Sequence, residues 1–216
     1  KATADFLRDK SAYLEREVAL RTLEVQAIQD VTIMAMTSLA ETRDNETGNH
    51  IRRIQLYVKA LAERLRNHPR FEAVLNERMI ELLYKSAPLH DIGKIGIPDS
   101  ILLKPGKLTV EEFEVMKTHT TLGRKAIEDA ERRLGMRVAF LSVSKEIAYS
   151  HQEKWDGSGY PQGLAGDQIP VSARLMAVAD VYDALINKRV YKVAFSHDQA
   201  CSTIVKGKGT HFDPDM

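Results

Sequence analysis

Apolar residues recur with helical spacing through most of this 216-residue chain, whereas strand signals are almost absent. The segment Thr109-Val110-Glu111-Glu112 has the form of a capping box that opens a helix. The other expected helices cover residues 31–41, 51–66, 138–150, 171–186 and 197–206, with two more stretches between 71 and 92, and loops are expected at 67–70, 98–108 and 155–170. The body of the chain is therefore predicted to be all-α.

The first forty residues lack Gly and Pro and carry a heptad-like pattern. Its apolar positions follow alternating steps of three and four, with polar interruptions at Ser11, Arg21 and Thr32. The apolar positions are Leu7, Leu14, Val18, Val25, Ile28, Ala35 and Leu39. Two interpretations stay open for residues 1–36: a dimerising coiled-coil linker, or a single amphipathic helix packed on its own domain. Because the first residue is Lys1 and not Met, a piece of a longer protein is expected.

The composition limits which partners the chain can have. With 44% hydrophobic residues, 28% charged residues and a formal net charge of +1, it suits one sizeable core plus an appendage. The near-neutral balance supplies no general field for a nucleic acid polymer or a membrane surface. The single Cys201 excludes an internal disulfide and suits a reducing cytosol. No apolar run approaches the ~20 residues that a membrane-spanning helix needs, so a cytoplasmic protein is expected.

The adjacent residues His90 and Asp91 offer an imidazole nitrogen and a carboxylate oxygen, which are two good metal ligands. On a helix, Lys94 would share a face with Asp91 and place a cation where a metal-bound phosphate needs one. Gly93, Gly96 and Pro98 would then end that helix. A lone His-Asp pair would be only a surface cap or a salt bridge, so the metal interpretation depends on further ligands.

Further candidate ligands lie in the predicted helices. Glu46 and His50 are spaced to share a helix face, and Asp180 stands inside an apolar run, where an uncompensated carboxylate would be costly. His119 is expected near a helix start and His151 at a helix end. Any single histidine could be a satisfied interior residue, but together they favour a metal site without thiolates, suited to Fe, Mn, Ni or Zn. Two ions that share Asp91 are typical of phosphoester hydrolysis.

Several ordered motifs resemble the HD-GYP domain, a branch of the HD phosphohydrolase superfamily, over roughly residues 37–216. The first 36 residues lie outside the resemblance and look like the linker that often follows a response-regulator receiver domain. The matching motifs are 41–50 (ETRDNETGNH), 90–94 (HDIGK), 97–102 (IPDSIL), 155–161 (WDGSGYP), 179–185 (ADVYDAL), 189–192 (RVYK) and 209–214 (GTHFDP).

The resemblance implies hydrolysis of the second messenger cyclic di-GMP to the linear dinucleotide pGpG, and often on to GMP. It implies an HD-type helical bundle that holds two divalent ions, with Fe or Mn favoured and Ni or Zn acceptable. It assigns Asp91 and Lys94 to catalysis, and Lys94, Arg189 and Lys192 to the substrate phosphates. The implied metal ligands are His50, His90, Asp91, His119, His151 and Asp180.

One departure concerns His151-Gln152, where many family members carry two adjacent histidines. An amide is a poor ligand beside imidazole, so Gln152 is not expected to bind metal, and Glu46 is expected as a neighbouring acceptor or an occasional ligand. Two ions and not three are therefore expected, and the second cleavage to GMP is in doubt. Asp183, one turn after Asp180, is expected either to orient a ligand or to be a plain surface acid.

The loop motif Gly159-Tyr160-Pro161 would present an aromatic ring on a stiff turn. That ring could stack on a guanine, dock a partner protein, or pack for the stability of the loop. Two alternatives to the enzyme remain: a catalytically weak sensor that binds cyclic di-GMP and signals through a dimeric N-terminal helix, and a nucleotidase that acts on another phosphoester.

Overall fold

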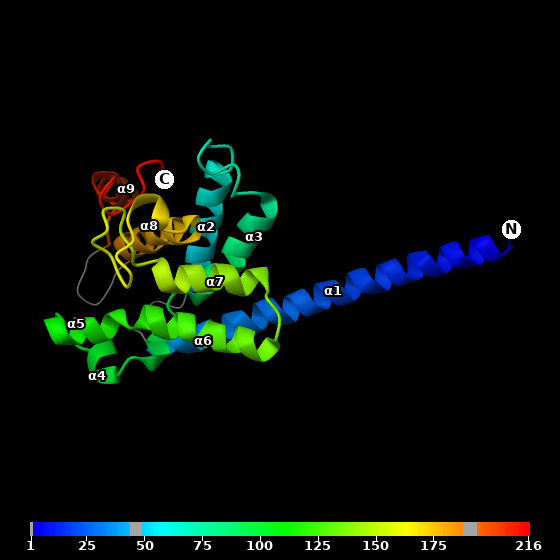
Figure 1. Cartoon of the computed structure of the whole chain (residues 1–216), viewed down its shortest axis with the longest axis horizontal. Helices are drawn as coiled ribbons and strands as arrows, with labels where there is room; N and C mark the ends of the chain where they lie inside the picture. The colour runs from blue at the N-terminus through cyan, green and yellow to red at the C-terminus, as the bar shows by residue number, and fades with distance from the viewer. Residues whose placement is uncertain (1, 44–48, 188–193) are drawn as a thin grey trace. The chain divides into compact units, whose positions relative to one another are not determined.

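A computed structural model describes residues 2–43, 49–187 and 194–216 (Figure 1). Within these ranges the regular structure is helical, and the only extended pairings are two isolated bridges, Asp156 with Ala165 and Lys208 with Phe212. The all-α prediction is therefore confirmed. The chain divides into two compact units, Lys1–Met36 and Thr37–Met216.

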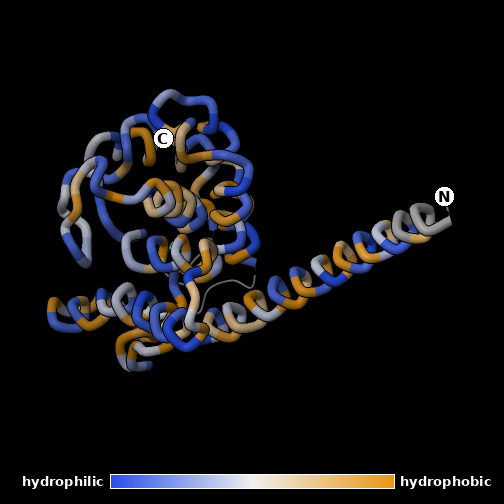
Figure 2. The backbone as a smooth tube through the Cα atoms, turned by 45° about the vertical axis from the view of Figure 1, so that its right-hand side comes forward, coloured by the Kyte–Doolittle hydropathy of each residue, from blue (hydrophilic) through white to orange (hydrophobic). Residues whose placement is uncertain are grey.

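The first unit is formed by most of helix α1 (Ala2–Arg43). Among the side chains of this helix that the structure describes, the apolar ones are largely exposed, including Val18 and Val25 at 64% each. In the predicted seam, Arg21 pairs along the same helix with Glu17 at 3.2 Å and with Glu24 at 2.9 Å. Figure 2 shows hydrophobic and hydrophilic residues alternating along this helix. In the described part of the chain, every helix is too short or too polar to cross a bilayer.

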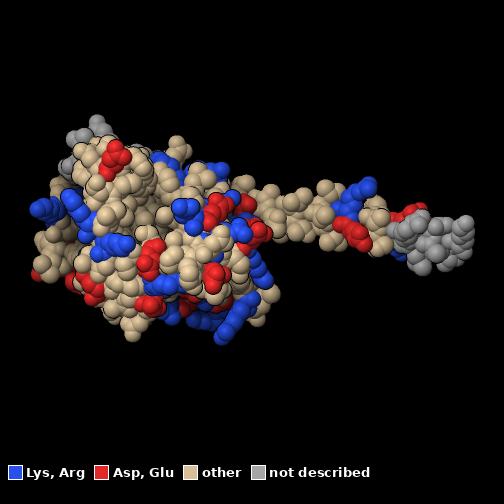
Figure 3. All heavy atoms as spheres, turned by 90° about the horizontal axis from the view of Figure 1, so that it is seen from above, with Lys and Arg blue, Asp and Glu red and all other residues tan. Residues whose placement is uncertain are grey.

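The second unit is a bundle whose core lies among α2 (His50–Leu65), α3 (Glu77–Ser86), α7 (Ala139–Ser150) and α8 (Val171–Ile186). Helix α2 packs against both α3 and α8, and α7 packs against α3, α8 and α6 (His119–Leu134). The core side chains are almost all aliphatic, with few polar atoms to satisfy. They include Ile54, Val58, Phe71, Leu75, Leu83, Ile147, Leu175 and Met176. Figure 3 shows acidic and basic side chains interspersed over the visible face of this unit.

Shorter helices complete this unit. They are η1 (Ala87–Leu89), η2 (Ile92–Gly96), α4 (Asp99–Leu102), α5 (Val110–Lys117), η3 (Gly166–Gln168) and α9 (His197–Lys206). The predicted capping box is confirmed: Thr109 Oγ1 accepts from the Glu112 amide, and the Glu112 carboxylate accepts from the Thr109 amide at 2.7 Å. Ser196 and Gln199 form a second capping box at the start of α9.

Three local predictions were wrong. The segment 98–108, predicted as a loop, contains the short helix α4, which begins directly after Pro98. The predicted loop 155–170 contains the 3-10 helix η3. His90 and Asp91 lie between the 3-10 helices η1 and η2, and not on an α-helix. The reason is close packing: a Cβ on Gly93 would lie 1.9 Å from the carbonyl oxygen of His119, so η2 rests backbone to backbone on α6. Such an approach favours short, tight turns over a regular helix.

Candidate metal centre

Three of the predicted histidines are oriented by carbonyl groups within their own turns. The Nδ1 atoms of His90, His119 and His151 lie 3.0 Å, 2.7 Å and 3.0 Å from the carbonyl oxygens of Ala87, Met116 and Ile147, respectively. A carbonyl can only accept a hydrogen bond, so Nδ1 must donate in each ring. In the neutral tautomer the lone pair then resides on Nε2, which is the form that binds a metal ion.

His50 is oriented differently, by a side chain from another helix. As the first residue of α2, it places Nδ1 2.7 Å from Oδ2 of the buried Asp183 on α8. Arg53, one turn along α2, donates to both oxygens of Asp183, at 2.6 Å and 3.0 Å. Burial raises the pKa of Asp183, but its bonds to His50 and Arg53 outweigh that effect and leave the pKa below its usual value. An ionised Asp183 therefore holds His50 in place.

Asp91 lies at the centre of the histidines. Its Oδ2 is 3.2 Å from Nε2 of His90, and its Oδ1 is 3.4 Å from Nε2 of both His119 and His151. The ammonium of Lys94 lies 2.7 Å from Oδ2. One carboxylate therefore faces three imidazoles and a cation, and its two oxygens point toward different histidines.

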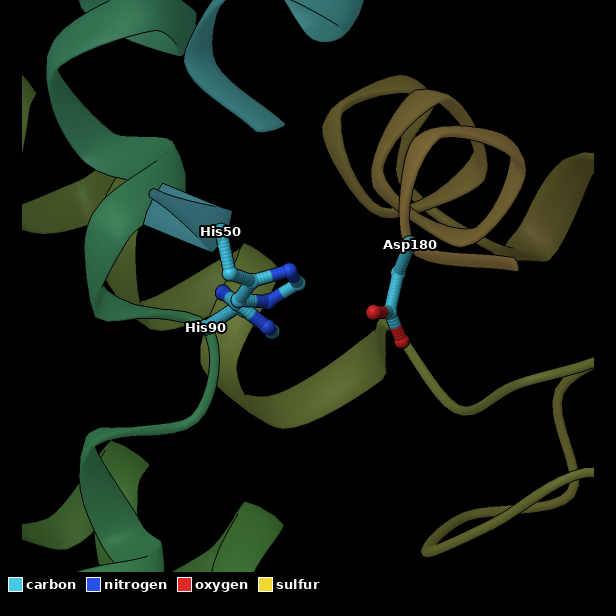
Figure 4. Close-up of side chains that lie close together, drawn as sticks. All are labelled: His50, His90 and Asp180. Carbon is cyan, nitrogen blue, oxygen red and sulfur yellow. The ribbon is translucent and has the colours of Figure 1, made fainter. Parts of the chain in front are cut away.

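The candidate ligands form two groups of three, and within each group the ligand atoms lie within 4.8 Å of one another. One group is Asp91, His119 and His151, and the other is His50, His90 and Asp180. Figure 4 shows the rings of His50 and His90 facing the carboxylate of Asp180, which extends from α8. Asp180 is half-buried, which is less than its apolar surroundings in the sequence led us to expect.

The hydrogen bonding of the buried polar atoms tests whether these residues fit a metal centre, and they do. The Nε2 atoms of His90, His119 and His151 and the Oδ1 atom of Asp91 are buried and make no hydrogen bond within the described residues. Buried polar atoms are nearly always satisfied, and leaving several unsatisfied in one place is costly. Divalent cations would satisfy all of them at once.

The electrostatics of the site agree with this test. Burial lowers the pKa of His90, but the nearby negative charges of Asp91 and Asp180 raise it to about 9. Burial lowers the pKa of His119 to about 4 despite the nearby Asp91. Burial raises the pKa of Asp91, but Lys94 and His90 bring it well below its usual value. An ionised Asp91 attracts positive charge, which a metal ion would supply in place of a proton.

A small cavity opens beside the His50 group. Sequence reasoning missed Glu41, which lines this cavity and accepts a hydrogen bond from the amide of Ile51 at 3.1 Å. It also missed Arg53, although the three-residue spacing from His50 placed the two on one helix face. The cavity is lined by Thr37, Ala40, Glu41, His50, Ile51, Pro88, His90, Asp91, Ile92 and Lys94.

The loop that carries Tyr160 is fastened by the buried Glu153, whose carboxylate accepts from the amides of Gln162 at 2.8 Å and Leu164 at 3.0 Å. A Cβ on Gly159 would lie 2.3 Å from the amide nitrogen of Lys154, so only glycine fits there. Tyr160 is half-buried, and its ring stands edge-on to that of His119, with centroids 6.2 Å apart. The loop thus places an aromatic ring beside the candidate metal ligands.

Three predicted residues lie outside the described ranges: Glu46, Arg189 and Lys192. Gln152 is described, and its carbonyl oxygen accepts from the Tyr160 amide at 3.2 Å, which gives its backbone a part in holding the loop. The structure brings the six predicted ligands and Lys94 together. A site that combines two candidate cation-binding groups with a lysine is suited to bind and cleave a phosphoester.

Comparison with known proteins agrees with this arrangement. A match to the HD domain family covers residues 35–216. A Vibrio cholerae protein named "Cyclic di-GMP phosphodiesterase" is 62% identical over 191 residues, which are 88% of this chain and 39% of that protein. Another from the same organism, "Probable cyclic di-GMP phosphodiesterase", is 56% identical over 214 residues, which are 99% of this chain and 48% of that protein. This chain thus spans less than half the length of these relatives.

A solved structure of a cyclic GMP-AMP specific phosphodiesterase from V. cholerae, V-cGAP3, has a similar fold. The TM-score is 0.56 at 20% identity, over 85% of this chain and 46% of that one. The family match, the fold and the paired His90 and Asp91 at the centre of the site lead to the same assignment. The chain belongs to the HD domain family, as its resemblance to the HD-GYP branch predicted.

Proposed function

We propose that residues 37–216 form a metal-dependent phosphodiesterase that hydrolyses cyclic di-GMP to linear pGpG. The observation that carries the proposal is the position of Asp91, whose carboxylate faces His90 on one side and His119 and His151 on the other. Such a carboxylate suits two cations held close together, which is the usual arrangement for cleaving phosphodiesters. The names of the two Vibrio cholerae relatives support the choice of substrate.

We propose that the site takes two divalent ions, one at each group of three ligands. Imidazole and carboxylate donors suit Fe or Mn best, and Ni or Zn also fit such donors. The expected ligands are His50, His90, Asp91, His119, His151 and Asp180, with Glu46 as an occasional addition. When bound, such ions supply Lewis-acid activation of the phosphodiester and of the attacking water.

The residues of the chain bind and orient the substrate around that chemistry. Lys94 holds its ammonium beside Asp91, where it neutralises charge that develops on the phosphate oxygens. Asp183 and Arg53 fix the ring of His50 and so keep its ligand atom in position. Arg189 and Lys192 are proposed to bind the substrate phosphates.

The alternative function is a catalytically weak cyclic di-GMP sensor, which would bind the same ligand without turnover. For the rest of the protein we propose a cytoplasmic location and a homodimer joined through residues 1–36, whose exposed apolar positions support pairing. We also propose that the Gly159-Tyr160-Pro161 loop binds a protein partner.

The test is turnover of cyclic di-GMP, followed by chromatography, with protein reconstituted anaerobically with Fe(II) or Mn(II). The wild type is expected to form pGpG with little GMP, and Asp91→Ala is expected to lose activity by about a thousandfold or more together with bound metal. Asp129→Asn, at a partly exposed position of α6 where the carboxylate pairs with Arg132 on the surface, serves as the control. Protein that holds two ions, binds cyclic di-GMP and forms no product would favour the sensor. Cleavage of other phosphoesters but not cyclic di-GMP would favour a different nucleotidase.

A further inference from the structure

Beside the metal centre lies an aromatic and cationic wall that none of the catalytic assignments uses. It consists of Phe113 and Lys117 on α5 and Tyr160 on the loop. The rings of Phe113 and Tyr160 stand edge to face, with centroids 6.0 Å apart and planes at 85°. The ammonium of Lys117 lies 5.1 Å from the Phe113 centroid and 5.7 Å from the Tyr160 centroid. Tyr160 in turn meets the candidate ligand His119.

Core packing does not account for Phe113. Helix α5, all of which the structure describes, has no buried residue, and Phe113 is 43% exposed. Tyr160 is packed edge-on between His119 and Phe113, so its ring is already engaged. Phe113 is therefore the member of the wall that offers aromatic surface to solvent, one ring beyond a candidate metal ligand.

On this basis we propose that Phe113 and Lys117 form a subsite for a guanine base of the substrate. This inference rests on the proposed function, because it requires a phosphodiester bound at the metal centre. A nucleotide carries its base one ribose away from its phosphate, and Phe113 lies one aromatic ring away from His119. An exposed ring in that position suits stacking of a base on its face.

Lys117 gives the subsite its selectivity. Guanine presents two acceptors, O6 and N7, on one edge, whereas adenine presents N7 beside an amino donor. An ammonium donates only, so it favours the guanine edge and is opposed by the adenine amino group. Lys117 also pairs with Glu114 at 2.6 Å, which holds its side chain on this side of α5. Stacking on Phe113 would accept either purine, and Lys117 would discriminate between them.

The experiment compares metal-loaded wild type with Phe113→Ala, Phe113→Trp and Lys117→Met, after metal content has been measured for each. With cyclic di-GMP, Phe113→Ala is expected to raise KM about tenfold and leave kcat within about twofold, and Phe113→Trp is expected to restore KM. Lys117→Met is expected to reduce the preference for cyclic di-GMP over cyclic di-AMP. The matched controls are Val110→Ala and Lys125→Met, which alter exposed side chains on α5 and α6.

Methyl p-nitrophenyl phosphate, a phosphodiester without a purine, separates the two proposals. Its hydrolysis should be the same in wild type and in every subsite variant. If Phe113→Ala loses metal or this activity, its role is structural and the subsite proposal is overturned. An unchanged KM for cyclic di-GMP in Phe113→Ala also overturns it, although the phosphodiesterase proposal stands. Failure of the wild type to bind or cleave cyclic di-GMP would instead defeat the proposed function itself.

Discussion

The four candidate histidine ligands are oriented in two different ways. His90, His119 and His151 take their orientation from carbonyl oxygens three or four residues earlier in the chain. His50 takes its orientation from Asp183, 133 positions away, with Arg53 as a second support. The first three rings are thus set by local backbone geometry, whereas the fourth depends on the packing of α2 against α8. Local rings need only their own turn to form, but His50 needs the completed bundle.

Because of this difference, the two groups of candidate ligands should respond differently to substitutions. Disturbing a carbonyl-oriented histidine requires disturbing the backbone around it, since the acceptor is a main-chain atom that no substitution removes. Disturbing His50 requires only one side-chain substitution on another helix. The group of His50, His90 and Asp180 should therefore lose metal first when the bundle is perturbed.

The largest effect is expected from Gly93→Ala, which would disturb the backbone beside the carbonyl-oriented histidines. The added methyl would meet the His119 carbonyl and the Gly123 amide, neither of which can move without shifting α6. We expect a loss of about 2–3 kcal/mol in the free energy of unfolding, measured by urea denaturation, together with impaired metal binding.

Gly96→Ala is the matched control for that substitution, because its methyl would meet only the flexible end of the Leu122 side chain. If Gly93→Ala were no more destabilising than Gly96→Ala, the backbone contact between η2 and α6 would not be what positions Asp91 against His119.

An intermediate effect is expected from Asp183→Asn, which changes the side chain that orients His50. The substitution removes the negative charge that pairs with Arg53 and orients His50. One equivalent of metal should bind about 10- to 100-fold more weakly while the other is unaffected, as measured by titration with Mn(II). Equal weakening of both equivalents would show that the two groups do not respond separately.

The smallest effect is expected at a cluster that involves no metal ligand. Arg70 pairs with Asp167 at 2.6 Å and also with Asp215. Hydrogen bonds from Arg70 lower the pKa of both carboxyls from 3.8. Because the folded pKa lies below the unfolded one, the stabilisation is present above pH 3.8 and is lost as the pH falls through the lowered values.

Urea midpoints of wild type and Arg70→Leu should therefore differ at about pH 6 and converge toward about pH 3. Lys59→Met, whose ammonium lies 3.7 Å from Glu63 on the surface of α2, is the control and should shift the midpoint little at either pH. A constant difference between wild type and Arg70→Leu across this range would mean that the aspartates contribute nothing to it.

Sequence reasoning reached most of the helices because their apolar periodicity and caps are local signals, as the capping box at Thr109 illustrates. It also identified the candidate ligands, because they lie in motifs that match the HD-GYP family in the same order along the chain. It placed His90 and Asp91 on a regular helix, because the close approach of Gly93 to α6 is a tertiary contact. It missed Arg53 for the same reason: in the sequence it looks like a surface arginine, and its role comes from a contact with Asp183 on another helix.

The fastening of the loop by Glu153 has a consequence for association kinetics. Two backbone amides bind this buried carboxylate, and Gly159 lies against the chain at residues 153 and 154, so the ring of Tyr160 is positioned before any ligand arrives. The entropy of ordering the loop is then lost during folding and not during encounter with a ligand. A ligand that enters past Tyr160 should therefore associate in a single kinetic phase, without a slower step of loop closure.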